Sequence, residues 1–151
     1  MYGNFTVFIK LYQTKSPVSG LELMQELESL FHSAEAVTAN IGEDSKSDEV
    51  LIATINIFEN CARLISNESL FSDNEEIDDC STNNIKYLAV NYYMAKLKCE
   101  IRDLYTRKYY LLEARKHYQD YLNTLIQLKI VKEIDYAYSE SRSKVRSQQK
   151  S

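Results

Sequence analysis

Two histidines and three cysteines are the residues of this 151-residue chain that could act as proton carriers, nucleophiles or zinc ligands. Catalysis by such groups needs a base or an orienting partner beside the nucleophile, and a zinc site needs paired ligands at short spacing. His32 and His117 fall on different predicted helices, and Cys61, Cys80 and Cys99 form no C-x-x-C pair. The chain also has no H-E-x-x-H or G-x-S-x-G motif. We therefore predict no enzyme activity, no catalytic or metal site and no cofactor, and interpret each histidine as a surface or helix-seam residue.

An acidic run at residues 73–79 has the composition of a calcium loop but not its spacing. The EF-hand loop needs glycine at its sixth position and glutamate at its twelfth. Counted from the first residue of the run, those positions hold Asp78 and Asn84. We interpret the run as a solvated linker. Ser72, with Glu75 three residues later, is a weak candidate for phosphorylation by an acid-directed kinase.

Basic side chains near residue 145 could recognise carboxylates on a partner. Arg142, Arg146 and Lys150 recur every four residues, so on a helix they would form one positive ridge, with Lys144 nearby. Arginine forms bidentate pairs with carboxylates that lysine cannot reproduce. We take Arg142, Lys144, Arg146 and Lys150 as candidate partner-binding residues. The alternative interpretation of this segment is a solvated helix end.

The net charge of −4 is divided unevenly along the chain. Residues 1–84 contain 4 Lys/Arg against 15 Asp/Glu, a net of −11, whereas residues 85–151 contain 14 against 7, a net of +7. Such a division predicts a surface with separate negative and positive faces. A nucleic-acid-binding protein is more often basic throughout, so we expect no nucleic-acid partner.

Composition places the chain among helical globular proteins. It is 44% hydrophobic and 26% charged, with only three glycines and one proline. All-β folds and glycine-rich phosphate loops need many more turn residues, which excludes both. No run approaches the roughly 20 apolar residues of a membrane span, and the odd cysteine count fits a reducing compartment. We expect no membrane association and a cytosolic location, with the nucleus left open as a second one.

Apolar residues recur at helical spacing through most of the chain, which predicts an all-α fold. The predicted helices span about 21–38, 48–66, 82–101 and 106–129, followed by a polar segment at 132–151. Ser47 is the predicted N-cap of the second helix, and Ser81 or Thr82 that of the third. The third helix carries apolar residues on two faces and should lie between its neighbours. We expect antiparallel helical hairpins packed as a tetratricopeptide-like α-solenoid or bundle, with a poorly ordered lead-in at 1–20 and one domain at 21–151.

Tyrosine is concentrated in the second half of the chain, where ten of the twelve lie between Tyr87 and Tyr138. We interpret them as helix-seam packing residues, because tyrosine is amphipathic. The alternative is a recognition role, with Tyr109 and Tyr110 as exposed anchors.

Residues 70–97, LFSDNEEIDDCSTNNIKYLAVNYYMAKL, strongly resemble the type 2A phosphatase-associated protein family. That family includes yeast regulators in the target-of-rapamycin pathway and the animal alpha-four, or immunoglobulin-binding-protein-one, proteins. Its signature is LFS-x-NE, an acid-rich turn, a Ser-Thr start and an aliphatic helix with a Tyr-Tyr pair, all present here. Residues 111–131, LLEARKHYQDYLNTLIQLKIV, look like the second landmark of the family.

The resemblance implies a tetratricopeptide-like domain without catalytic activity that binds catalytic subunits of type 2A, type 4 and type 6 phosphatases. It also implies competition with the scaffold subunit, and contact through a basic pattern like Arg-x-x-Lys-Ile. Here Lys144-Val145 fits Lys-Ile, but Ser141 stands where the arginine is expected, and the arginine is at 142. We expect a regulatory subunit in target-of-rapamycin signalling that is monomeric on its own and C-terminally shorter than the family.

A second function hypothesis is a tetratricopeptide-type adaptor that binds peptide termini of chaperones or other partners. It predicts a concave row of Lys, Arg and Asn that captures a terminal carboxylate. Affinity for short acidic-ended peptides would distinguish it from a regulator that binds only a folded phosphatase.

Overall fold

The computed structural model describes residues 19–41, 46–72 and 75–132. Within them lie four α-helices and two short 3-10 turns, and no β-strand is formed. The helices are α2 (Gly20–Ala39), α3 (Asp48–Asn67), α4 (Val90–Glu100) and α5 (Arg107–Gln127), and the turns are η1 (Ile77–Asp79) and η2 (Ile85–Ala89). The predicted all-α fold is confirmed.

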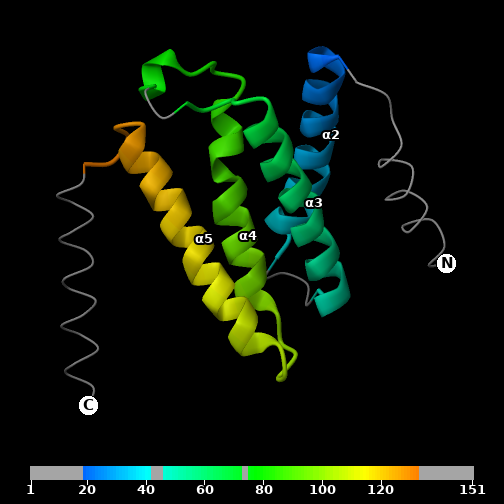
Figure 1. Ribbon diagram of the computed structural model, residues 1–151. Coiled ribbons are helices and arrows are strands. Elements are labelled where there is room, and N and C mark those ends of the chain that lie inside the picture. The colour runs from blue at the N-terminus through cyan, green and yellow to red at the C-terminus, as the bar shows by residue number, and fades with distance from the viewer. Residues whose placement is uncertain (1–18, 42–45, 73–74, 133–151) are drawn as a thin grey trace.

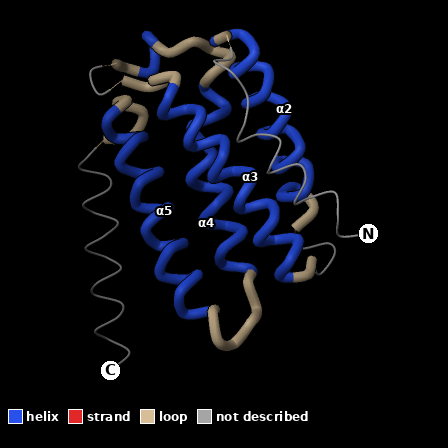
Figure 2. The backbone as a smooth tube through the Cα atoms, turned by 45° about the vertical axis from the view of Figure 1, so that its right-hand side comes forward, coloured by secondary structure: helices blue, strands red, loops and turns tan. Residues whose placement is uncertain are grey.

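Each helix packs beside the helix that precedes it, so the four form an array in chain order (Figures 1 and 2). Neighbouring helices run in opposite directions, as the predicted hairpins require. Helix α4 lies between α3 and α5, which confirms the central place predicted from its two apolar faces. Helices α2 and α5 are left at the two ends of the array, where only one side of each is covered by the described helices.

The first two helices begin at hydroxyl caps. Ser19 and Glu22 form a reciprocal capping box, in which each side chain accepts a hydrogen bond from the backbone N–H of the other. The Ser47 hydroxyl accepts from the Val50 N–H at 3.4 Å, which confirms the predicted cap of α3. These bonds satisfy backbone donors that a helix leaves unpaired at its N-terminus.

The predicted start of the third helix at Ser81 or Thr82 is wrong. The chain first forms the 3-10 turn η2, and the α-helix begins only at Val90, with Ala89 as an N-cap whose side chain makes no capping bond. The tight turn brings Tyr87 into the core, where its ring meets Phe31 edge to face at 5.2 Å. Tertiary packing therefore overrides the local capping signal.

Helix α5 ends at Gln127, two residues before the predicted end. Lys129 takes a left-handed conformation at φ 58°, its N–H bonds to the Ile126 carbonyl, and the Ile130 N–H bonds to the Leu125 carbonyl. This is a Schellman motif. Helix α3 ends in the same way, with Ser69 at φ 49°. Neither helix uses the glycine that usually marks such an end, so no residue type at these positions signals the end of the helix.

An aromatic cluster forms the centre of the core. Phe58 stacks on Tyr93 at 5.3 Å, and Phe31 meets Phe58 edge to face at 6.1 Å. Aliphatic side chains from α2, α3 and α4 surround these rings. Edge-to-face and offset contacts add to the stabilisation that burial of the rings provides. The core therefore lies between the first three helices, and α5 is attached to its outer side.

The acidic linker is held against both the core and α5. Leu70 and Phe71 pack on the core. The Ile77 N–H donates to the Leu128 carbonyl at 3.2 Å, and Lys129 pairs with Glu76. The linker thus joins the C-terminal ends of α3 and α5.

Among the described residues, no helix is long and apolar enough to cross a membrane.

Candidate partner interface

The four basic residues predicted to bind a partner lie outside the described residues. No geometry is assigned to Arg142, Lys144, Arg146 or Lys150, and their role stays a prediction.

Net charge changes sign along the helix array. Helix α2 carries four glutamates and no Lys or Arg, and α3 carries three acidic residues and one arginine. Helix α4 carries two lysines and one glutamate, and α5 carries four basic and two acidic residues. The nets are −4, −2, +1 and +2 in array order. The predicted charged faces therefore lie at opposite ends of the array.

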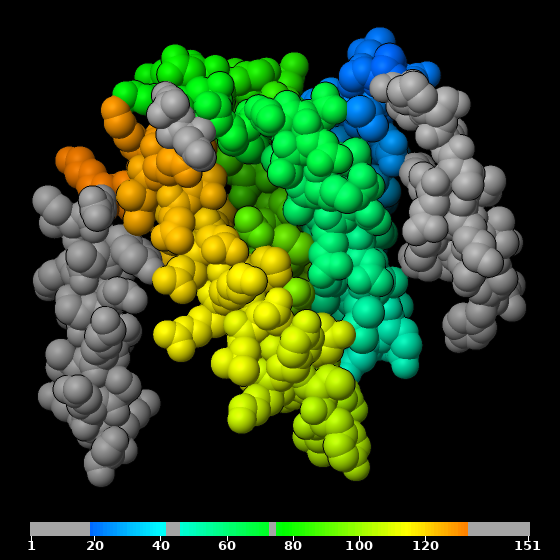
Figure 3. Space-filling view, in the orientation of Figure 1, coloured from blue at the N-terminus to red at the C-terminus, as the bar shows by residue number. Residues whose placement is uncertain are grey.

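Large apolar side chains are exposed at the positive end. Ten such residues are exposed in the described part of the chain, and half of them fall within residues 104–112. We call these five the α5 stripe: Leu104, Tyr105, Tyr109, Leu111 and Leu112. Tyr105 is 96% exposed and Leu104 is 87% exposed. Both belong to the corner between α4 and α5, a yellow-green segment at the lower end of the coloured part of Figure 3. Concentrations of exposed apolar side chains typically mark interaction sites.

Two sequence interpretations are changed by this surface. Helical spacing alone would place Leu111 on the inner face of α5, but the residue is 41% exposed. Tyr109 is exposed, as the recognition alternative requires, whereas Tyr110 packs partly against the core. The seam of α5 is instead built around Ala114, its one fully buried residue among those described. The small side chain of Ala114 permits close approach of α5 to α4.

The corner between α4 and α5 is fixed by backbone hydrogen bonds to two aspartates. The Asp48 carboxylate, at the start of α3, accepts from the Arg102 N–H at 3.0 Å and the Asp103 N–H at 2.8 Å. The Asp103 carboxylate accepts from the Thr106 N–H and hydroxyl at 2.8 and 2.7 Å. The bonds from Thr106 lower the pKa of Asp103. Leu104 and Tyr105 are therefore exposed on an ordered turn rather than on a loosely held one.

A buried ammonium group holds α5 to α4. The side chain of Lys98 is 5% exposed, and its Nζ lies 3.0 Å from His117 Nε2 on α5. Glu59 of α3 and Glu113 of α5 approach the same ammonium at 3.8 and 3.9 Å. Sequence analysis missed Lys98, although its position four residues after Met94 places it on the apolar face of α4. His117 is a seam histidine and His32 a surface one, as interpreted.

The cysteines are free thiols that offer no reactive group. Cys61 is fully buried in the core, and burial raises the pKa of its thiol to about 12. Burial also raises the pKa of Cys99 and Cys80. A thiol with a raised pKa is a poor nucleophile, because the thiolate is the reactive form. No group of three or more metal-ligating side chains occurs in the described residues.

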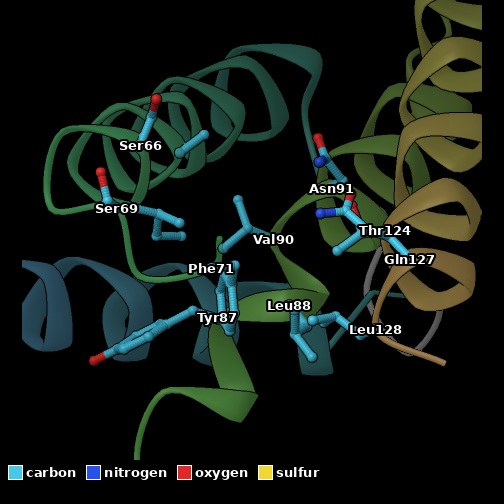
Figure 4. A pocket seen from close by; sticks show the side chains of 12 residues that line it. Ser66, Ser69, Phe71, Tyr87, Leu88, Val90, Asn91, Thr124, Gln127 and Leu128 are labelled. Atoms are coloured by element: carbon cyan, nitrogen blue, oxygen red, sulfur yellow. The ribbon is translucent and has the colours of Figure 1, made fainter. Parts of the chain in front are cut away.

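A groove of about 460 Å³ opens between the C-terminal ends of α3 and α5 (Figure 4). Val90, Phe71 and Leu128 provide apolar surface, and the polar groups are hydroxyls and amides from Ser66, Ser69, Asn91, Thr124 and Gln127. No lysine or arginine is among the described residues that line it. The groove therefore lacks the cationic row that the adaptor hypothesis predicts.

Comparison with known proteins identifies the relatives of this chain. The model of the TAP42-like family matches residues 22–151, which include α3, α4 and α5 and all of α2 except its first two residues. The chain belongs to the TAP42-like family. The resemblance noted at residues 70–97 and 111–131 is thereby confirmed and extends to α2 and α3.

Curated relatives of this chain come from plants and from a yeast. The chain is 38% identical over 71 residues to the PP2A regulatory subunit TAP46 of Arabidopsis thaliana, covering 47% of this chain and 18% of the relative. It is 26% identical over 116 residues to TAP46 of Oryza sativa, covering 77% and 28%. An uncharacterised Schizosaccharomyces pombe protein is 28% identical over 72 residues, covering 48% and 21%. The matches thus span less than a third of each relative.

Proposed function

We propose that this TAP42-like chain is a non-catalytic regulatory module that binds catalytic subunits of type 2A, type 4 and type 6 protein phosphatases in target-of-rapamycin signalling. The family match over residues 22–151 carries the proposal. Relatives named PP2A regulatory subunits support it. A role without catalysis agrees with His117, which is held in a seam, and with Cys61, which is enclosed in the core.

The charge distribution indicates how such a module would meet its partner. The positive end of the array carries α5, and the basic residues from Arg142 to Lys150 follow it in sequence. We propose that Arg142, Lys144, Arg146 and Lys150 pair with carboxylates on the catalytic subunit. Exposed charge pairs of this kind steer association and weaken as salt screens them. The module itself is a cytosolic monomer in this account, with the nucleus as a possible second location.

Titration calorimetry of the chain against a purified type 2A catalytic subunit tests the proposal. The variant Arg142→Glu, Lys144→Glu, Arg146→Glu tests the basic residues, and Arg63→Glu on the exposed side of α3 is the matched charge-reversal control. We expect the wild type and the control to bind and the triple variant to lose affinity, with unchanged circular dichroism. Absence of binding by the folded wild type would refute the proposal.

The adaptor hypothesis receives no support from the described groove. A carboxylate-capturing site needs cationic or amide donors that converge on one point. The described groove offers Asn91 and Gln127 but no lysine or arginine. We expect peptides with acidic C-termini to give no measurable heat when they are titrated into the chain.

A further inference from the structure

The α5 stripe is not needed to attach α5 to the rest of the molecule. The seam with α4 is built from Ala114, from the Lys98–His117 contact and from half-buried tyrosines such as Tyr118. Tyr105, Tyr109 and Leu112 follow at spacings of four and three residues, so they share one face of the helix and its leading turn. Leu112 is 58% exposed and Tyr109 is 60% exposed on that face. These side chains therefore form an apolar surface that the described fold does not bury.

Basic side chains lie among the apolar ones. Lys108, Arg115 and Lys116 are exposed on the same half of α5, and none of them makes an ion pair within the described residues. By contrast, Lys86 is paired with Glu28 and Lys129 with Glu76. Unpaired cations beside exposed apolar groups are complementary to a surface that combines apolar side chains with carboxylates.

The surface is also held in place before any partner arrives. The Asp48 carboxylate fixes the corner through the N–H groups of Arg102 and Asp103, and the Asp103 carboxylate accepts hydrogen bonds from Thr106, the residue just before α5. An ordered surface loses little conformational entropy on binding, which favours affinity. Exposed tyrosines supply large contact area with only two side-chain torsions to fix.

We propose that the α5 stripe, with Lys108, Arg115 and Lys116, is a docking surface for the phosphatase catalytic subunit, separate from the basic residues at 142–150. This inference rests on the proposed function. The segment that docks there presents apolar side chains flanked by Asp or Glu. A protein partner is favoured over nucleic acid because the three leucines of the stripe cannot stack on bases as aromatic rings do.

One variant of the α5 stripe and one control variant test whether the stripe contributes to binding. Leu104→Ser, Tyr105→Ser removes the two most exposed side chains of the corner, which make little contact in the folded chain. Leu21→Ser is the control, because Leu21 is 70% exposed at the acidic end of the array. Titration with the type 2A catalytic subunit should show about tenfold weaker binding for the stripe variant and an unchanged affinity for the control.

A charge variant tests the chemistry assigned to the partner. Lys108→Glu, Lys116→Glu should weaken binding and flatten its dependence on salt, because fewer cation–carboxylate contacts remain to be screened. Photocrosslinking gives a readout that does not depend on affinity. A benzophenone side chain at position 105 should crosslink to the catalytic subunit, and the same group at position 21 should not.

The outcomes distinguish this inference from the function on which it rests. If the wild type binds and both stripe variants bind equally well, the stripe proposal is overturned and the regulatory function stands. If the wild type does not bind, both are overturned. Self-association of the wild type that the serine variant abolishes would identify a contact between copies of the chain and contradict the proposal. Binding of a single-stranded oligonucleotide that is lost in the same variant would also contradict it.

Discussion

Lys98 of α4 and His117 of α5 join the two helices through a contact that fixes which ring nitrogen of the histidine carries the proton. Lys98 Nζ lies 3.0 Å from His117 Nε2, and a lysine ammonium can only donate hydrogen bonds. Nε2 must therefore accept, which leaves the ring proton on Nδ1. That nitrogen lies 2.9 Å from the side-chain oxygen Oδ1 of Asn91 and donates to it. The contact requires neutral His117. Protonation would place two positive charges in direct contact.

The surroundings of His117 oppose that protonation. Burial lowers the pKa of His117 first, and the positive charge of Lys98 lowers it further. The carboxylates of Glu113, Asp120 and Glu59 act in the opposite direction. The net pKa lies below the ordinary histidine value of about 6.5. Folded and unfolded chains therefore bind protons differently in mildly acidic solution.

We predict that stability falls as the pH drops below about 6.5. Above that pH His117 is neutral in both the folded and the unfolded chain, so its contribution to the free energy of unfolding is fully present. As the pH falls, the unfolded chain takes up the proton first, and the free energy of unfolding declines until the pH has passed the folded pKa. Urea unfolding at about pH 7.5 and about pH 5.5 measures the decline.

Substitution of each histidine in turn tests whether His117 causes the decline in stability. His117→Gln removes the titrating group, so the decline should become smaller. His32→Gln, at a surface histidine whose side chain is 57% exposed, leaves His117 in place, so the decline that His117 causes should persist. Equal declines in wild type and His117→Gln would show that other groups govern the acid response.

A second prediction concerns the close approach of α5 to α4 at Ala114. Ala114 is 1% exposed, so a larger side chain has no space there. Ala114→Leu should lower the free energy of unfolding by about 1–3 kcal/mol through overpacking. Ala36→Leu, on the exposed side of α2, should change it by less than about 0.5 kcal/mol. Thermal unfolding followed by circular dichroism compares the two variants.

A third prediction follows from the left-handed residue at the end of α3. Ser69 adopts φ 49°, which costs a residue with a Cβ about 1–2 kcal/mol and costs glycine almost nothing. Ser69→Gly should therefore raise the free energy of unfolding by about 1 kcal/mol. Ser66→Gly, three residues earlier within the helix, should lower it by a similar amount. A lower free energy of unfolding for Ser69→Gly would mean that the serine side chain stabilises the folded chain by more than its left-handed conformation costs.

A fourth prediction tests whether Asp48 orders the corner that carries Leu104 and Tyr105. Asp48→Ala removes the acceptor for the Arg102 and Asp103 N–H groups and should cost about 2 kcal/mol. Glu49→Ala, the neighbouring change in the first turn of α3, leaves that acceptor in place. Hydrogen exchange at residues 102 and 103 should accelerate in Asp48→Ala alone. Equal protection in both variants would show that other contacts hold the corner.

Sequence periodicity predicted the helices well because their apolar positions recur at regular spacing. The caps at Ser19 and Ser47 are local signals, and α2 and α3 accordingly begin within a residue of the predicted positions. Tyr87 shows where local reasoning fails, because its contact with Phe31, 56 residues earlier, selects a 3-10 turn over an early helix start. The predicted end of α3 at residue 66 lies one residue from the observed end. The end of α5 was placed two residues too late, because Lys129 takes a left-handed conformation that its residue type does not indicate.

Surface features were predicted less completely than helices. The division of charge in the sequence became the gradient from α2 to α5, because sequence order and array order coincide. Of the α5 stripe, only Tyr109 was anticipated, as an exposed anchor in the recognition alternative. The leucines of the stripe were missed, because a leucine such as Leu111 is interpreted as a core residue wherever helical spacing permits it. Lys98 was missed for the opposite reason, since lysine is rarely buried. The basic residues at 142–150 lie outside the described residues and stay a prediction.

The most direct test of the account is the mass of the complex formed by the full chain and the isolated type 2A catalytic subunit, measured by sedimentation velocity at about 50 mM and about 300 mM salt. We predict one chain per catalytic subunit at low salt and partial dissociation at high salt, with less complex at both for Leu104→Ser, Tyr105→Ser. Two species that sediment independently at low salt, with the chain folded, would contradict the account.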